Sequence, residues 1–410
     1  MVRGAMQTVP LAAWLLPRGG GRRKLWTLAQ TRSSMELLFG EDLHLARVRS
    51  LANGVAGVLN ASVVSIAAIG RAYARLAMIE SKSGVKQVDR LLSNEEVKLD
   101  EVMPLWVKHV VGTTQNIVLA LDWTDFEDDD HTTLCAHLVT THGRATPLAW
   151  KTVEKSTLKK KRTGHELEMI RQLYTWLPES VSVTLLADRA FGYAELYELL
   201  GTYGCNYVIR FRENIIVAEP GAEGVAAADL VLAHGRVRKI VDATVTRKKT
   251  KVPAVVLVKR KGMKEAWCLA TSLTTADANE IVKAYSKRFT IEETFRDQKD
   301  ITFGVGLRAT HIRDAGRRDR LLLLIAIAYT LRTLLGAASE ASKLDKTLKT
   351  NTSPRRTMSL FNQGLYWYSC LDSMRAEWLD RLLSAYEEIV RGHEFLAEIL
   401  KFESPREATN

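Results

Sequence analysis

The order of strands and helices between residues 112 and 211 constrains the fold of this chain more than any other feature. Three apolar, β-branched segments come first and predict an antiparallel meander. A helix, a strand, a second helix and a last strand follow. The strands are predicted at 116–121, 132–141, 145–150, 182–187 and 207–211, and the helices at 163–177 and 192–203. This order predicts an α/β fold with a mixed sheet and flanking helices.

Two of these strands are followed directly by an aspartate, and these residues are Asp122 and Asp188. The order of elements is that of an RNase H-like fold, and in open α/β sheets ligands collect at the carboxyl ends of strands. That rule applies only in part to the first strand of a meander. An acidic residue after a strand is also a common turn residue. Taken singly, each aspartate is more simply explained as a turn.

A third carboxylate of interest lies on a helix predicted to start or restart at Thr290. Thr290 and Glu293 have the spacing of a capping box, which gives Glu293 a structural role. Glu292 is left without such a role. The helix face of Glu292 also carries two cations, and a straight helix would add a tyrosine and a further arginine; these residues are Arg296, Lys299, Tyr285 and Arg288.

The cations around Glu292 admit two interpretations. Ion pairs between residues four apart on a solvated helix have the same spacing. A metal beside a phosphate would also need a carboxylate ringed by cations. Three carboxylates gathered in one place repel one another, at about 4 kcal/mol per pair at about 4 Å, and therefore favour a divalent cation. Carboxylate oxygens alone select Mg²⁺, with Mn²⁺ as a substitute.

The charge of the chain predicts a polyanionic partner. The net charge is +11 over 410 residues, with a pI near 9.4. A basic surface of this kind indicates nucleic acid first and an anionic membrane second. The longest apolar run, 321–329, is far shorter than the ~20 residues of a spanning helix. The four cysteines are scattered, which argues against a disulfide framework or a cysteine-based zinc site.

Two regions carry cations that could face DNA. In 36–111 the pattern is helical, and two helices joined by a tight glycine-containing turn would present Lys86 and Arg90, as in a helix-turn-helix. An ordinary small helical bundle has the same pattern. The second region, 212–275, predicts further strands and carries eleven cations: Arg236, Arg238, Lys239, Arg247, Lys248, Lys249, Lys251, Lys259, Arg260, Lys261 and Lys264.

These observations predict six regions along the chain. They are a disordered leader (1–35), a helical DNA-binding region (36–111), a first core segment (112–211), a β-rich basic insertion (212–275), a second core segment (276–340) and a helical C-terminal region (341–410). The amphipathic helix predicted at 374–400 could pack on its own domain or on a second copy.

Four residues with fixed spacing relate the chain to a known family. The pattern Tyr285-x2-Arg288-x3-Glu292-x6-Lys299 resembles the Y-R-E-K signature of bacterial DDE transposases of the insertion-sequence-four family. The segments 121–124 and 187–192 resemble the two aspartate motifs of that family, 207–210 the strand that follows, and 265–272 its last insertion strand. The resemblance extends from about residue 82 to 338.

The resemblance implies a role for each candidate residue. Asp122, Asp188 and Glu292 would bind the metal ions, with Asp125 as a rival of Asp122 in the same acidic segment. By the same resemblance Tyr285, Arg288 and Lys299 would contact DNA phosphates. As cations, Arg296 and Arg210 are also predicted to bind DNA. Trp267 would receive a flipped base, although a tryptophan on a strand can equally be a core residue.

The function predicted from these features is cut-and-paste DNA transposition. The protein would cleave transposon ends at terminal inverted repeats and join them to target DNA, with a hairpin intermediate, as a homodimer on paired ends. A bacterial, cytoplasmic location follows from the resemblance. Two alternatives are a metal-dependent nuclease of the same fold without strand transfer, and a relic that binds DNA but has lost its chemistry.

Overall fold

The computed structural model describes residues 25–126, 129–140, 144–299, 306–350 and 356–392. Its centre is a ten-stranded sheet with the strand order β3-β2-β1-β4-β5-β10-β9-β8-β6-β7. The strands are β1 (Asn116–Phe126), β2 (His131–Val139), β3 (Ala145–Glu154), β4 (Ser182–Ala187), β5 (Asn206–Phe211), β6 (Ile216–Ala218), β7 (Val225–Ala226), β8 (Arg238–Val245), β9 (Thr250–Val258) and β10 (Trp267–Thr271).

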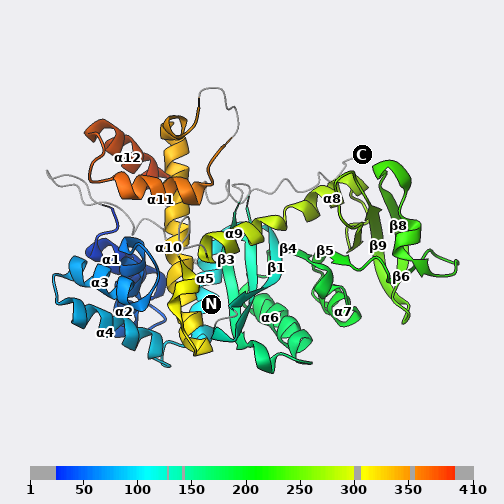
Figure 1. Cartoon of the computed structure of the whole chain (residues 1–410), viewed down its shortest axis with the longest axis horizontal. Coiled ribbons are helices and arrows are strands. Elements are labelled where there is room, and N and C mark those ends of the chain that lie inside the picture. Colours follow the sequence, from blue (N-terminus) through cyan, green and yellow to red (C-terminus); the bar gives the residue numbers. More distant parts are fainter. Residues whose placement is uncertain (1–24, 127–128, 141–143, 300–305, 351–355, 393–410) are drawn as a thin grey trace, which may run out of the picture.

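The predicted fold class is confirmed. The meander β1-β2-β3 is antiparallel, and β4 and β5 run parallel to β1. Two helices make the connections around β4: α6 (Arg162–Trp176) and α7 (Ala194–Thr202). β10 then pairs antiparallel with β5, so the three predicted insertion strands, β8, β9 and β10, extend the same sheet. Figure 1 shows this extension as the right-hand lobe of the molecule.

Helix α10 (Ala315–Ala341) is the central rod of the structure (Figure 1). It packs against β3 on one side and against the N-terminal helices α2 and α4 on the other. By length and composition it is the one helix in the described part of the chain that could cross a membrane, but 94% of its most apolar window is buried in the protein. Such burial is that of a core helix.

The N-terminal helices are α1 (Leu28–Phe39), α2 (Leu45–Asn60), α3 (Ile66–Ala77), α4 (Ser81–Ser93) and α5 (Leu99–Val111). The prediction of a disordered leader is wrong for residues 25–35, and residues 1–24 lie outside the described part. Thr27 caps α1 in a capping box, and Met35 on that helix is fully buried. Trp26 is also buried and donates a hydrogen bond from Nε1 to the Tyr386 hydroxyl at 3.0 Å.

The turn between α3 and α4 differs from the predicted glycine turn. Met78 makes it, in the left-handed region with φ of 54°. Gly84 instead lies inside α4, where an added Cβ would be 2.3 Å from the carbonyl oxygen of Gly70 on α3. The glycine therefore permits a close helix crossing rather than a tight turn. Lys86 and Arg90 are exposed on α4, as predicted.

The C-terminal region contains one helix that the sequence pattern did not predict, α11 (Leu360–Cys370), which packs closely on α10. Gly364 explains the close contact, because an added Cβ would be 1.8 Å from the carbonyl oxygen of Arg332. The last described helix is α12 (Ala376–Gly392), and the predicted continuation to residue 400 lies outside the described residues. Leu382, Leu383 and Tyr386 of its predicted apolar stripe are buried within this chain.

Strand β2 is buried along its whole length and carries two histidines, His131 and His137. Both side chains are buried. His131 accepts a hydrogen bond at Nδ1 from Arg318. His137 packs edge-on against Phe295, with ring centroids 5.3 Å apart.

His137 predicts acid sensitivity of the fold. Burial lowers the pKa of His137 to about 3, from an ordinary value of 6.5. Because the unfolded chain binds this proton more readily, stability is complete above pH 6.5 and falls as the pH decreases towards 3. We expect His137→Leu to reduce the loss of unfolding free energy between pH 8 and pH 5 by up to about 2 kcal/mol. Denaturant titrations at both pH values measure this; an equal loss in both proteins would contradict it.

Candidate active site

The parallel pairing of β1 with β4 places two aspartates side by side. The last paired residues are Leu121 and Ala187, and the next residue on each strand is Asp122 or Asp188. β1 itself continues to Phe126 against β2. The prediction that this strand ends at Asp122 is therefore wrong, since only the contact with β4 ends there. Both half-buried side chains lie at the same edge of the sheet, where ligands of such sheets bind.

Two consecutive helices, α8 (Ala278–Ser286) and α9 (Phe289–Lys299), carry the third carboxylate to this edge. Glu292 is exposed in the first turn of α9, and Arg288 lies in the break between the helices. The Arg288 guanidinium donates from Nη1 to Oδ2 of Asp122 at 2.9 Å and from Nη2 to Oε1 of Glu292 at 2.6 Å. One buried guanidinium therefore joins the strand carboxylate to the helix carboxylate.

The charges at this edge act on one another. Burial raises the pKa of Asp122 to about 6, and the charges of Asp188 and Glu292 also raise it. Arg288 and the backbone N–H of Trp123 oppose this shift. The charges of Asp188 and Glu292 therefore both act on Asp122.

Aromatic side chains line the same guanidinium. Arg288 lies over the Phe289 ring, 5.0 Å from its centroid, and over the Tyr285 ring at 6.0 Å. Trp267 packs edge-on against Tyr285, with centroids 4.9 Å apart, and also touches Phe289. Tyr285 is buried, whereas Trp267 is half-buried and Phe289 is exposed. The tyrosine thus supports Arg288 from within the fold, and the other two rings form an accessible aromatic pair.

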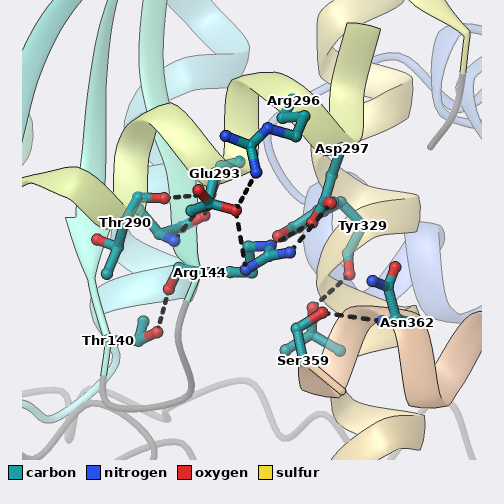
Figure 2. Close-up of polar contacts among 12 residues, drawn as sticks. Thr140, Arg144, Thr290, Glu293, Arg296, Asp297, Tyr329, Ser359 and Asn362 are labelled. Carbon is teal, nitrogen blue, oxygen red and sulfur yellow. Dashed lines mark hydrogen bonds and ion pairs between the residues drawn. The ribbon is translucent and has the colours of Figure 1, made fainter. Parts of the chain in front are cut away.

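The opposite face of α9 is fixed to the sheet by polar contacts (Figure 2). Arg144 donates from Nε to Asp297 at 2.6 Å and lies 3.7 Å from Glu293. The Thr294 hydroxyl donates to the carbonyl oxygen of Ala145 at 2.9 Å and accepts from its N–H at 2.8 Å. These contacts hold α9 against the sheet, and Glu292 on the same helix contacts Arg288.

The predicted capping role of Glu293 is wrong. Glu293 pairs with the exposed Arg296 at 3.0 Å as well as with Arg144. The Thr290 hydroxyl donates to the carbonyl oxygen of Lys287 at 2.9 Å instead of capping α9. The helix nevertheless restarts within one residue of the predicted position. Tertiary partners of Glu293 outweigh the local motif, because they hold it in an ion pair with the sheet.

Asp125, in the acidic segment after Asp122, has other partners. Asp125 accepts from Lys155 Nζ at 2.8 Å, and its pKa is lowered by that lysine against the effect of burial. Lys299 donates from Nζ to the backbone oxygen of Asp125 at 2.8 Å and lies over the Phe126 ring. Asp122 is therefore the better candidate for the site.

A protein-family model for the transposase DDE domain matches residues 114–331, more than half of the chain. The chain belongs to the DDE transposases. The matched range contains the three candidate carboxylates, Asp122, Asp188 and Glu292. A comparison with curated proteins found no match. The family membership implies DNA cleavage and strand transfer in transposition.

The predicted DNA-binding residues of this transposase fall into two groups. In the first group, Arg288 contacts Asp122 and Glu292, and Tyr285 and Trp267 pack beside it. Arg296 pairs with Glu293, and Lys299 donates to the backbone of Asp125. Arg210 donates from Nη2 to Glu265 at 2.8 Å, and the same carboxylate accepts from Arg189 at 2.6 Å. Lys86 and Arg90 are on α4, which Figure 1 places on the far side of α10 from the sheet. They are not part of the carboxylate site.

Sequence reasoning missed Arg189 and Glu166. Arg189 directly follows Asp188, and this adjacency was the available signal. Glu166 occupies a buried position of α6 with Met169, Ile170 and Leu173. The available signal was an acidic residue at helical spacing from these apolar ones.

DDE transposases typically use divalent metal ions, and the donor chemistry of this site fits them. Asp122, Asp188 and Glu292 offer carboxylate oxygens, the ligands that Mg²⁺ and Mn²⁺ prefer. The described residues contain no group of three such side chains already close enough to hold a metal. Arg288 contacts two of the three carboxylates, so a cation would compete with its guanidinium.

Proposed function

We propose that this protein is a cut-and-paste transposase of the insertion-sequence-four type. The observation that carries the proposal is the Arg288 bridge, which connects Asp122 with Glu292 beside Asp188. The bridge joins two members of the Y-R-E-K pattern to the first aspartate motif. A surface helix with ordinary ion pairs would not reach a half-buried carboxylate on a strand in this way.

Asp122, Asp188 and Glu292 would hold Mg²⁺ or Mn²⁺. When bound, such ions supply positive charge and Lewis acidity to an in-line displacement at phosphorus. The residues of the chain position the DNA. Arg288, Arg296 and Lys299 would hold phosphates at the transposon end, because guanidinium and ammonium groups bind phosphate oxygens through charge-assisted hydrogen bonds.

The accessible aromatic pair, Trp267 and Phe289, supports a base-binding role. Trp267 and Phe289 present accessible rings beside Arg288. A base that leaves the duplex could stack there, which offsets part of the unstacking cost. The resemblance extends this to a hairpin intermediate and to a homodimer that pairs two transposon ends. On the same resemblance we propose that the reaction takes place in a bacterial cytoplasm.

The decisive experiment combines cleavage with strand joining. Purified protein is incubated in Mg²⁺ with a duplex carrying the terminal inverted repeat of its own element and with a supercoiled plasmid. The proposal predicts cleavage at the repeat and covalent joining of the released 3′ end to the plasmid. Cleavage without joining would indicate a nuclease, and repeat binding without cleavage would indicate a relic.

The basic insertion predicts strongly salt-dependent binding. Three exposed cations, Arg247, Lys248 and Lys249, form the turn between β8 and β9. Because each phosphate contact releases counterions, it makes the logarithm of the binding constant fall more steeply with the logarithm of the salt concentration, by about 0.9 in slope. We expect the triple alanine variant to reduce the magnitude of this slope by up to about 3. Fluorescence anisotropy with a repeat duplex at several salt concentrations measures it.

A second triple variant removes the same charge from the segment after α10, at Lys343, Lys346 and Lys349. We expect it to change the slope less than the insertion variant. Equal slopes for the wild type and the insertion variant would exclude the β8–β9 turn as a DNA surface.

A further inference from the structure

A buried carboxylate on α6 lies behind both aspartate segments. Glu166 is 1% exposed and accepts hydrogen bonds from three elements. Its Oε1 accepts from Trp123 Nε1 at 2.7 Å and from Arg162 Nε at 3.1 Å, and its Oε2 accepts from the Tyr193 hydroxyl at 2.8 Å. Buried carboxylates are retained when their oxygens are hydrogen-bonded in this way.

The contact with Trp123 reaches Asp122 directly. Trp123 follows Asp122 on β1, and its backbone N–H donates to Oδ1 of Asp122 at 2.8 Å. The indole is held at its edge by Glu166 and on its face by Arg162, 5.2 Å from the ring centroid. The direction of the Asp122 carboxylate therefore depends on a residue whose side chain Glu166 fixes.

The contact with Tyr193 reaches the second aspartate. Asp188 caps the short helix η4 (Arg189–Phe191), and its side chain accepts from the Ala190 N–H at 2.8 Å. Tyr193 follows this turn and starts α7, with its N–H donating to the carbonyl oxygen of Phe191 at 3.0 Å. Holding the tyrosine hydroxyl thus fixes the end of the loop that carries Asp188.

We propose that Glu166 is a positioning residue that sets the separation of Asp122 and Asp188 by holding Trp123 and Tyr193 with its two oxygens. The inference rests on the proposed function, because it assigns those aspartates to metal binding. Residues that orient metal ligands through hydrogen bonds, without binding the metal themselves, commonly change metal affinity by about 10–100-fold when they are mutated. Glu166 would act on affinity for the ion without touching DNA.

The test uses the full chain and three variants that each remove one part of this arrangement: Glu166→Gln, Trp123→Phe and Tyr193→Phe. Binding of Mn²⁺ alone is measured by electron paramagnetic resonance, and binding of a terminal-repeat duplex by anisotropy without metal. We expect the Kd for Mn²⁺ to increase about tenfold in each variant. The Kd for DNA should change less than about twofold, because phosphate contacts determine it.

Glu168→Gln is the matched control, on the same helix but with a side chain that is 45% exposed. It should leave both constants unchanged. Unchanged Mn²⁺ affinity in all three variants, or an equal loss in the control, would overturn the role of Glu166. Thermal unfolding identifies a variant that fails to fold, in which case the other two decide.

The role of Glu166 and the proposed function can fail separately. Wild-type protein that does not join DNA ends but binds Mn²⁺ more tightly than the variants would reject transposition and retain the role of Glu166. Wild-type cleavage and joining, combined with unaltered Mn²⁺ affinity in the variants, would support transposition and reject the role of Glu166.

Discussion

Asp188→Ala will reduce metal-dependent cleavage of the transposon end by at least about a thousandfold, which corresponds to roughly 4 kcal/mol of transition-state stabilisation. Asp188 lies beside Asp122 where β1 and β4 separate, and its charge contributes to the field at that carboxylate. Removing it takes a hard oxygen ligand from the site but no DNA contact. Gel assays of cleavage and repeat binding, in Mg²⁺ and Mn²⁺, measure both effects.

Two further variants make the result specific. Asp188→Asn keeps an oxygen that can accept the Ala190 N–H and removes the charge, so a similar loss excludes misfolding of the turn. Asp125→Asn changes the rival carboxylate, which is 44% exposed and paired with Lys155. We expect the cleavage rate of this variant to stay within about fivefold of the wild type, because Asp125 is not one of the three proposed metal ligands. Full cleavage by Asp188→Ala would refute the metal assignment.

Arg288→Gln will destabilise the metal-free protein and enlarge the increase in Tm that Mg²⁺ causes. The guanidinium is 7% exposed and bridges two carboxylates, and removing one partner of a buried ion pair costs about 3–5 kcal/mol. We expect about 2–3 kcal/mol here, because Glu292 is half exposed and solvent screens it. The three carboxylates then repel one another, so Mg²⁺ should raise the Tm of the variant more than that of the wild type.

Arg288→Lys and Arg296→Gln are the comparisons for this prediction. An ammonium cannot donate to both carboxylates in the forked geometry of a guanidinium, so lysine should restore only part of the stability. Arg296 is exposed and paired with Glu293, so its loss should change the unfolding free energy by less than about 1 kcal/mol. Differential scanning calorimetry with and without Mg²⁺ measures all four proteins. A smaller Mg²⁺ response in Arg288→Gln than in wild type would contradict a shared cation site.

The helix that carries Glu292 shows which features local sequence patterns predict and which they do not. The restart near Thr290 was predicted, since the break after α8 and the apolar residues Ile291 and Phe295 are local features. The role of Glu293 was not predicted correctly. Its ion pair with Arg144 joins residues 149 positions apart, and no local spacing reports such a contact.

The end of the first strand shows a related limit. The apolar run stops at Leu121, and the strand was predicted to stop with it. β1 continues to Phe126 because β2 still supplies backbone partners, whereas β4 does not. Hydrophobic patterns report burial, and burial changes at Asp122 although the hydrogen-bonded ladder does not.

The sequence by itself determined the mixed α/β fold, the two aspartates and the Y-R-E-K spacing, because periodic apolar residues and fixed gaps are local properties of the chain. The tertiary structure decided how these residues meet. It placed Arg288 between Asp122 and Glu292, buried Tyr285 behind that arginine, and brought Glu166 against Trp123 and Tyr193. Such contacts depend on the register of parallel strands and on helix orientation, which are set by packing across the whole domain.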